Sequence, residues 1–270
     1  MSLDQAEAPA AVPDVAKRGR VRYILERNLI VYRHAWLVIL SGFFEPVFYL
    51  LAIGVGIGSL IGDITGPNGD VVSYTAYVAP GLLAASAMNG AVYESTFNIF
   101  FKMKFGKVYD GMLATPVTPR DIAIGEITWC QTRGLLYSAA FLGVMAAMGL
   151  LASPLAVLAL PGAVLIGFAF GAVGMAATTY MRSWTDFDMV QLVIMPLFLF
   201  SATFFPLEVY PAAIRPLVQV SPLYHGTTLL RSLTLGTAQW ADLGHAAYLL
   251  AITIAGLLVA TRRLTTLLLK

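Results

Sequence analysis

The chain has 270 residues, of which 58% are hydrophobic and only 12% are charged, and its mean hydropathy is +0.76. A soluble domain usually carries about 25% charged residues, because its surface must face water. This composition therefore excludes most soluble enzymes, nucleic-acid binders and disordered proteins, and lipid is the natural solvent for most of the surface. The formal net charge of +2 indicates no particular partner.

The N-terminal region divides into two parts. Residues 1–16 are rich in Ala, Pro and acidic side chains and contain no apolar core, so we expect a disordered tail and not a signal peptide. Residues 17–34 mix apolar side chains with basic ones such as Arg22 and Arg27. This mixture predicts an amphipathic helix in the headgroup layer of a membrane; the alternative is a charged flank before a membrane span.

Six apolar stretches follow, and each is close to the roughly 20 residues that cross a bilayer. They cover residues 36–61, 74–101, 122–151, 155–181, 189–205 and 243–261. Residues 206–242, between the last two stretches, contain four prolines and are too polar for a simple span. We expect two re-entrant helices there, since non-helical backbone at membrane depth must be buried in protein or line a cavity; the alternative is a folded external loop. The predicted fold class is an all-α integral membrane protein with six transmembrane helices.

The distribution of basic residues predicts the orientation. The two termini and the loops after the second and fourth stretches together hold fourteen of the seventeen Lys and Arg residues, whereas the opposite side holds only Arg215 and Arg231. Positive residues favour the cytoplasmic side of a membrane. We therefore expect a multi-pass protein of the plasma (cell inner) membrane with both termini in the cytoplasm.

Motifs of common active sites are absent from the sequence. It contains no GxxxxGK[ST] loop for ATP phosphates, no HExxH and no GxSxG. The segment Asp110–Thr115 partly matches the DGxxAR start of membrane alcohol phosphotransferases, but Thr115 replaces the arginine and no aspartates cluster downstream, as a two-metal site requires. A single cysteine, Cys130, excludes thiolate zinc sites and internal disulfides. We expect no catalytic residue, metal or cofactor in this chain, and no nucleic-acid partner.

Residues 102–121 form a basic and aromatic loop after the second stretch. A short amphipathic helix followed by two prolines would make a stiff protrusion that transmits force from a bound partner. Thr118 or Asp121 could cap the next helix, and Pro119 fits its first turn. The alternative is a basic loop held by anionic lipids. The candidate coupling residues are Lys102, Lys104, Phe105, Lys107, Tyr109, Met112, Leu113, Thr115 and Pro116.

Four ionisable residues lie within the apolar stretches: Glu45, Glu94, Glu126 and Arg133. A charge inside a bilayer is costly, so each should face protein, water or a partner. Glu126 and Arg133 are about 10 Å apart along one helix, too far for a sure contact. We therefore expect Arg133 to meet Glu45 or Glu94 across helices. Such a pair either fixes helix packing or guides a polar head group.

Aromatic residues near the expected external surface form either an interface belt or a gate that seals the pathway. The candidates for this gate or for the re-entrant region are Phe204, Phe205, Pro206, Tyr224 and His225.

Four segments, taken in order along the chain, carry a resemblance to a known family. They are EPVFYL at 45–50, MLATPVTPRDI at 112–122, FLFSATFFPL at 198–207, and SPLYH at 221–225 with Leu229-Leu230-Arg231 after it. In this order they resemble the permease subunits of the ABC-2 exporter family, and most closely the type that exports lipo-oligosaccharide nodulation factors. The resemblance covers nearly the whole chain from about Tyr23. Ala202 stands where members often have Gly, which bears on the tightness of the following turn.

The resemblance implies an ABC-2 transmembrane domain over residues 35–270. It also implies a homodimer bound to two copies of a separate ABC ATPase, which would hold ATP and Mg. The implied function is to form the membrane pathway for outward transport of an amphipathic substrate, such as a lipo-oligosaccharide, a glycolipid or a drug-like molecule. Membrane lipids would surround this pathway as further partners. Two other classes stay open: an integral membrane enzyme that modifies lipids, and an assembly subunit without transport.

Overall fold

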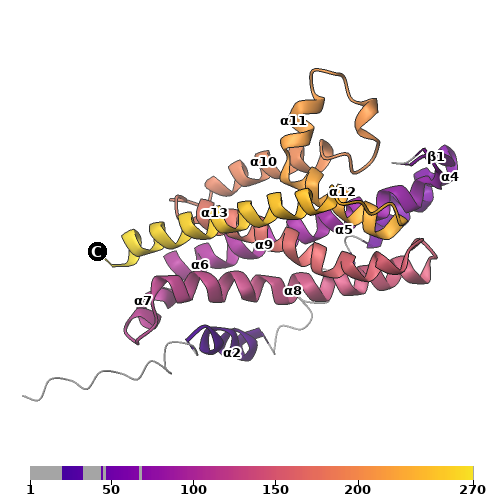
Figure 1. Cartoon of the computed structure of the whole chain (residues 1–270). Coiled ribbons are helices and arrows are strands. Elements are labelled where there is room, and N and C mark those ends of the chain that lie inside the picture. The colour runs from indigo at the N-terminus through magenta and orange to yellow at the C-terminus, as the bar shows by residue number, and fades with distance from the viewer. Residues whose placement is uncertain (1–19, 33–43, 45–46, 67–68, 270) are drawn as a thin grey trace, which may run out of the picture.

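The computed structural model describes residues 20–32, 44, 47–66 and 69–269. The predicted tail at 1–16, the edges of the predicted amphipathic helix and the first part of the first span, with Glu45, lie outside the described residues. The described chain is mostly helical, and its long helices run side by side along one axis (Figure 1). This confirms the prediction of a helical fold.

Helices make up most of the described residues. Their bounds are α2 (Arg20–Tyr32), η1 (Leu50–Ile57), α4 (Gly58–Ile61), α5 (Tyr74–Tyr93), η2 (Glu94–Asn98), α6 (Ile99–Lys104), α7 (Val108–Leu113), α8 (Pro119–Ala147), η3 (Pro154–Leu158), α9 (Ala159–Thr178), α10 (Asp186–Leu199), η4 (Leu207–Val209), α11 (Arg215–Val220), α12 (Pro222–Leu235) and α13 (Asp242–Leu268).

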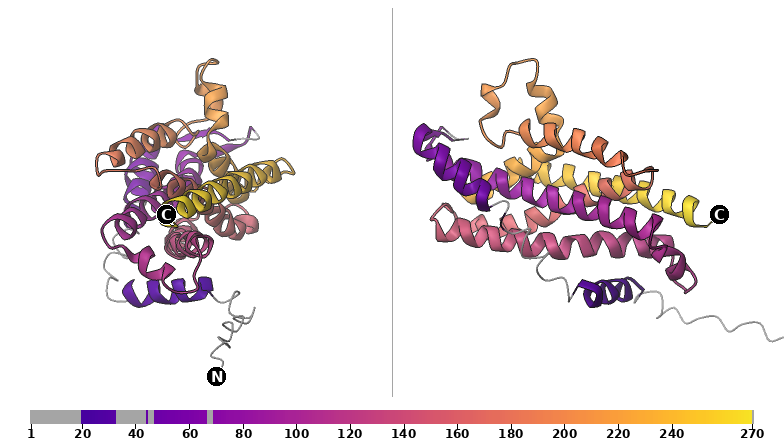
Figure 2. Two further views of the ribbon diagram at one scale, coloured as in Figure 1. Left: turned by 90° about the vertical axis from the view of Figure 1, so that its left-hand side faces the viewer. Right: turned by 180° about the vertical axis from the view of Figure 1, so that it is seen from behind.

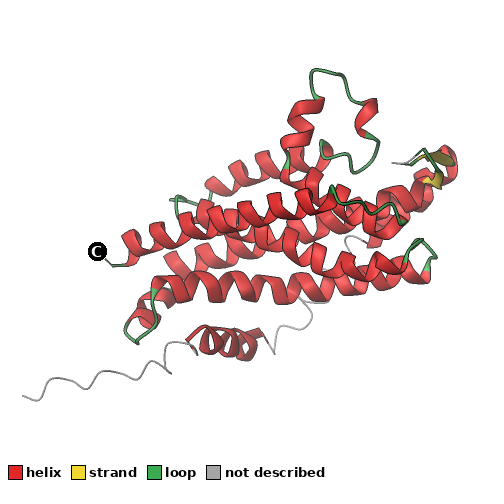
Figure 3. Ribbon diagram, in the orientation of Figure 1, coloured by secondary structure: helices red, strands yellow, loops and turns green. Residues whose placement is uncertain are grey.

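A small hairpin departs from the expected all-α fold. The strands β1 (Asp63–Thr65) and β2 (Val71–Ser73) pair antiparallel, with Ile64 opposite Val72 (Figure 3). The hairpin occupies the connection between the first two apolar stretches, where the sequence analysis marked no element. Gly62 precedes it with a φ of 76°, a conformation that glycine adopts without steric cost.

Helix α9 lies at the centre of the bundle and packs against α5, α8, α12 and α13. Small residues permit these close approaches, as is typical of helices that associate in membranes. On α13, a Cβ at Gly256 would lie 2.9 Å from the backbone of Ala172. On α12, a Cβ at Gly226 would lie 2.7 Å from Ile166. Each of these glycines therefore sets how closely a neighbouring helix meets α9.

The observed bounds refine the predicted spans. The second stretch is one continuous helix through α5, η2 and α6, and the last extends to Leu268, seven residues beyond its predicted end. The predicted fifth span was too long: α10 ends at Leu199, and residues up to Pro206 form a turn because Ala202 adopts a φ of 54°. The predicted re-entrant region contains the short helices α11 and α12.

Two helices among the described residues are long and apolar enough to cross a membrane: Pro154–Thr178, with a mean hydropathy of 2.2, and Asp242–Leu268, with 2.0. A third apolar helix, Val47–Ile61, is shorter. The prediction of six spans is therefore supported only in part by length and composition.

The connections gather at two opposite ends of the bundle (Figures 1 and 2). Helix α7 and the C-terminus lie at one end, and the β-hairpin lies at the other. We name the first the basic end, because exposed Lys104, Lys107 and Arg262 belong to it. The alternation of helix direction therefore brings the basic loop and the C-terminus together, as the charge pattern predicted.

Helices α10 and α11 lie at the side of the bundle. No residue of α10 is buried, whereas its neighbour α9 contains thirteen buried residues. Large apolar side chains of this region are exposed, among them Met189, Leu192 and Leu217. Helix α11 and the segment before it stand out from the bundle (Figure 1). The isolated chain therefore leaves an extended apolar face uncovered here.

Candidate functional site

The coupling loop is built at the basic end by α6, α7 and the start of α8. The side chain of Thr118 accepts a hydrogen bond from the backbone of Asp121, whose carboxylate in turn accepts one from the backbone of Thr118, and Pro119 occupies the first turn of α8. This capping box fixes the direction in which the chain enters α8. It confirms the predicted helix start.

The predicted coupling residues divide by exposure. Lys104, Phe105, Lys107, Thr115 and Pro116 are exposed and form a surface that a partner could reach. Met112 and Leu113 are half-buried beneath that surface. The remaining two, Lys102 and Tyr109, are buried within this chain, so they support the protrusion and do not belong to its outer face. Burial raises the pKa of the Tyr109 phenol well above its ordinary value, with the charge of Glu126 as the next cause.

Buried charges join this loop to α2 and α8. Lys102 Nζ lies 2.7 Å from Glu126 Oε2, and Asn28 Nδ2 donates to the same carboxylate oxygen at 3.3 Å. Lys102 also donates to Asn28 Oδ1 at 3.3 Å. All three side chains are buried, and we call them the buried triad. Glu126 therefore pairs with a residue that sequence reasoning had assigned to the coupling surface.

Helix α2 is fastened to α8 next to the triad. Ile24 is buried, and a Cβ at Gly125 would lie 2.9 Å from its Cγ2 atom. The opposite side of α2 exposes Tyr23, Leu29 and Ile30, each more than 60% accessible. An apolar face directed away from the bundle beside basic residues is what a helix in the membrane interface requires.

A second ion pair lies deeper in the bundle. Arg133 donates to Glu94 Oε2 at 2.6 Å and to the Tyr137 hydroxyl at 3.0 Å. Asn98 donates to the other carboxylate oxygen of Glu94 at 2.7 Å. The predicted pairing of Arg133 with Glu94 is confirmed, whereas the alternative partner, Glu45, lies outside the described residues. The distance along the helix disfavoured Glu126 as a partner, but the sequence could not choose between Glu45 and Glu94.

This pair faces a cavity of about 580 Å³, which we call the polar cavity. Its walls come from α5, η2, α8 and α10, and its polar lining includes Ser86, Asn89 and Gln191 besides the ion pair. Aromatic rings also line it, including Tyr93 and Phe97, which stack at 5.2 Å. Cavities that bind ligands combine apolar walls with a few such polar groups.

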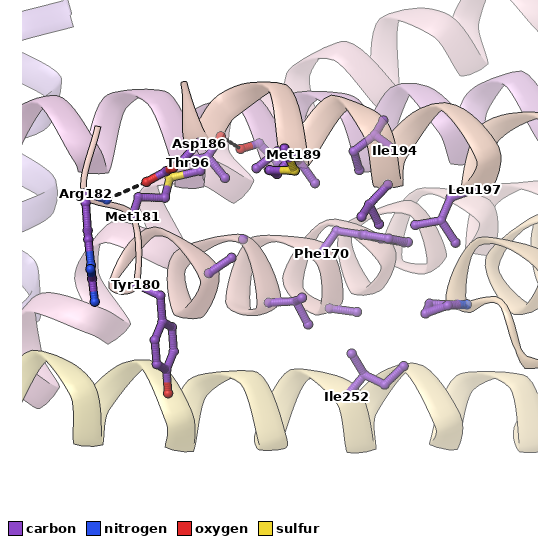
Figure 4. A pocket seen from close by; sticks show the side chains of 18 residues that line it. Thr96, Phe170, Tyr180, Met181, Arg182, Asp186, Met189, Ile194, Leu197 and Ile252 are labelled. Atoms are coloured by element: carbon purple, nitrogen blue, oxygen red, sulfur yellow. Dashed lines mark hydrogen bonds between the residues drawn. The ribbon is translucent and has the colours of Figure 1, made fainter. Parts of the chain in front are cut away.

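A second cavity, of about 570 Å³, lies between α9 and α10, and Ile252 of α13 also lines it (Figure 4). We call it the apolar cavity, because Phe170, Leu197, Ile252 and similar side chains line it. Its polar groups gather at one end, where Asp186 accepts a hydrogen bond from the backbone of Arg182 at 2.6 Å (Figure 4).

The candidate gate residues surround the turn that follows α10. Phe204 packs on Phe198 in an edge-to-face contact at 5.2 Å, and Phe198 lines the polar cavity. Phe205 is exposed and contacts Tyr210 at 4.7 Å, and Pro206 follows it. On the neighbouring helices, His225 Nδ1 lies 2.7 Å from Nδ1 of His245, and Tyr224 packs against both imidazoles. The gate residues therefore form two groups, of which only the first adjoins the polar cavity.

Sequence reasoning missed the role of Arg231. Charge counting placed it on the external surface, but it is 4% exposed and its guanidinium donates to the carbonyls of Tyr77, Ala202 and Thr203 at 2.8–3.3 Å. It also lies 3.7 Å from the ring centroid of Tyr77. Arg231 therefore joins α12, α5 and the turn after α10. The one feature of the sequence that could have predicted its burial is its position within an apolar stretch, where a charged side chain is expected to face protein.

These features define a helical membrane protein with charged groups inside its bundle and a basic, exposed loop at one end. Among the described residues, no group of three or more His, Cys, Asp and Glu side chains could hold a metal ion.

Comparison with known proteins identifies the family. The profile described as ABC-2 type transporter matches residues 20–235, and the chain belongs to this family. A Nodulation protein J of Rhizobium leguminosarum bv. viciae is 35% identical over 216 residues, which cover 79% of this chain and 81% of that protein. Nodulation protein J of Rhizobium meliloti (strain 1021) is 31% identical over 216 residues, with 79% and 80% covered.

A more distant Nodulation protein J, from Bradyrhizobium diazoefficiens, is 28% identical over 214 residues, with 78% of this chain and 80% of that protein covered. The resemblance read from the sequence is therefore confirmed. Members of this family are membrane subunits of transporters and pair with an ABC ATPase subunit.

Proposed function

We propose that this chain is the permease of an ATP-driven exporter that moves an amphipathic molecule, with a sugar-rich head and a hydrocarbon tail, outward across the cell inner membrane. The observation that carries the proposal is the polar cavity with the Glu94–Arg133 pair inside otherwise apolar helices. A charged pair in such surroundings is costly and marks a substrate path by default. The similarity to proteins named Nodulation protein J supports the same assignment.

The energy source in this proposal is a separate ATPase. The sequence lacks a P-loop, and the exposed part of residues 102–121 forms a protrusion stiffened by the capping box. ATP binding by the partner would press on Phe105, Lys107 and Thr115 and so move α6 and α8. The buried triad would pass this movement on to α2, because it joins all three helices.

The proposed membrane arrangement has six spans: the helix that contains Val47–Ile61, the continuous helix α5–α6, α8, η3–α9, α10 and α13. The basic end then faces the cytoplasm, since positive residues are retained there. Helix α2 lies in the inner interface, and α11 and α12 re-enter from the outside.

In the same proposal two copies of the chain assemble through the side that carries α10. Helix α10 has no buried residue, and Met189, Leu192 and Leu217 expose apolar surface there. Exposed apolar patches of this kind mark interaction sites or contact with lipid. A dimer would place two copies of the polar cavity beside a common axis.

Reconstitution with the ABC ATPase encoded nearest to this chain tests the proposal. The isolated permease should hydrolyse no ATP, whereas the complex in proteoliposomes should hydrolyse it and move substrate. Thr115→Trp, on the exposed protrusion, should uncouple ATP hydrolysis from export. Gln239→Trp, at an exposed position before α13, is the matched control. Full ATPase activity and export in the Thr115→Trp complex would exclude the coupling role, and failure of every candidate ATPase to bind would refute the function.

Orientation is tested by cysteine accessibility in a Cys130→Ala background. Thr115→Cys should react with a membrane-impermeant maleimide only in inside-out vesicles, and Gln239→Cys only in intact spheroplasts. The reverse pattern would place the protrusion outside the cell and would rule out coupling to a cytoplasmic ATPase.

A further inference from the structure

The polar and apolar cavities share a wall. Four residues line both of them: Val92 and Thr96 at the junction of α5 and η2, and Val190 and Ile194 on α10. Each pair is spaced by four residues, so each forms a stripe on one helix face. The Thr96 hydroxyl donates to the Val92 carbonyl at 2.7 Å, which satisfies its polar group within its own helix. The seam between the cavities is therefore bordered by aliphatic groups.

The two cavities differ in chemistry. The polar cavity offers several hydroxyls, two amides and stacked aromatic rings, and its two charges, Glu94 and Arg133, neutralise each other. Such a lining suits an uncharged, hydroxyl-rich group better than a phosphate. The apolar cavity offers Phe170, Val193, Ile252 and similar side chains along most of its length. It suits a hydrocarbon chain.

We propose that the two cavities form one divided site, in which a glycoside head occupies the polar cavity and its single hydrocarbon tail passes the Val92–Ile194 seam into the apolar cavity. This inference rests on the proposed function, and it adds where the tail lies and which head is selected. A methylene chain is narrow enough to follow an aliphatic seam, whereas a sugar ring is held back by its size and hydration. The seam of Val92, Thr96, Val190 and Ile194 therefore separates the head from the tail.

The head supplies most of the selectivity. Lipid is as apolar as the tail cavity, so a tail that leaves the bilayer for this cavity gains little free energy. Hydrogen bonds to Asn89 and Gln191 and stacking on the aromatic rings have no counterpart in the hydrocarbon layer. A change in the polar cavity should therefore alter how often a tail occupies the apolar cavity across the seam.

Photolabelling of the full-length chain in phosphatidylcholine nanodiscs tests this divided site. The probe is tetradecyl maltoside with a diazirine at the end of its tail, and labelled residues are located by mass spectrometry. In the wild type we expect label on the cavity side of α9 and α10, around Val173 and Val193. An excess of tetradecyl maltoside should suppress this label roughly tenfold, whereas tetradecyl phosphate should suppress it less than about twofold.

Variants separate the two halves of the site. Ala177→Trp fills the apolar cavity from α9 at an exposed position, and it should lower the label there roughly tenfold. Val193→Trp fills the same cavity from α10 and serves if the first variant does not fold. Ala255→Trp, at an exposed position of α13 that does not line the cavity, is the control and should leave the label unchanged. Asn89→Leu in the polar cavity should lower the label about fivefold, the effect of one lost hydrogen bond.

The inference is overturned if label falls only on the exposed face of α13 around Leu258, or if Ala177→Trp and Val193→Trp both leave the label in place. It is also overturned if Asn89→Leu has no effect or tetradecyl phosphate competes as well as the maltoside, because an ordinary lipid tail would then fill the cavity. If ATP-driven export persists while the label is absent, only the tail site fails. If the label is present but no ATPase couples, the export function fails instead.

Discussion

Replacement of Lys102 by Met tests the buried triad. Methionine keeps much of the side-chain length but removes the ammonium group that lies 2.7 Å from Glu126 Oε2. The side chain of Glu126 is only 1% exposed, so water cannot solvate the charge that is left. Removal of one partner of such a pair costs about 3–5 kcal/mol. In a chain of this size the loss lowers Tm by roughly 10 °C.

The measurement is thermal unfolding of the purified full-length chain in detergent, followed by tryptophan fluorescence. The double variant Lys102→Met/Glu126→Gln removes both charges and keeps an acceptor for Asn28, so it should recover most of the lost stability. Lys104→Met is the matched control, because Lys104 is exposed in the same helix, and such surface changes stay within about 0.5 kcal/mol. An unchanged Tm in Lys102→Met, or a double variant no more stable than the single one, would refute this account.

Three further predictions concern other contacts. Gly125→Ala should lower Tm by an amount equivalent to about 1–3 kcal/mol, because the new methyl group would collide with Ile24 and push α2 away from α8. Gly143→Ala is the control and should be neutral or stabilising, because its added Cβ would meet nothing within 4 Å. Equal Tm values for the two variants would contradict the close packing of α2 on α8. Arg231→Met should lower Tm by the equivalent of about 2–4 kcal/mol, because three buried carbonyls lose the guanidinium that donates to them. Limited proteolysis should then cut the chain near residue 203. A wild-type Tm and cleavage pattern would show that Arg231 does not hold the turn. Cys130 is 2% exposed and should resist N-ethylmaleimide until the chain is denatured, so rapid modification of the native protein would place it at the surface.

Hydrophobic content and basic residues were sufficient to predict much of this protein. Apolar runs long enough for lipid marked the helices, because a backbone in lipid must satisfy its hydrogen bonds within each segment. The pattern Thr118-Pro119-Arg120-Asp121 predicted the start of α8, since capping depends on residues adjacent in sequence. The family was recognisable for the same reason: its motifs are short, local and ordered along the chain.

Only the tertiary structure decided the partners of the buried charges. Lys102 and Tyr109 belong to a basic, aromatic segment and were predicted to lie on its surface, but packing within the chain buries both. Arg231 was counted as an external charge, but the turn at Ala202 supplies two carbonyl acceptors and Tyr77 on α5 supplies a third. The two cavities and their shared seam depend on how α10 is placed against α5, η2 and α9. Sequence periodicity gives the face of each helix, but the distance and rotation between helices result from the packing of all of them together.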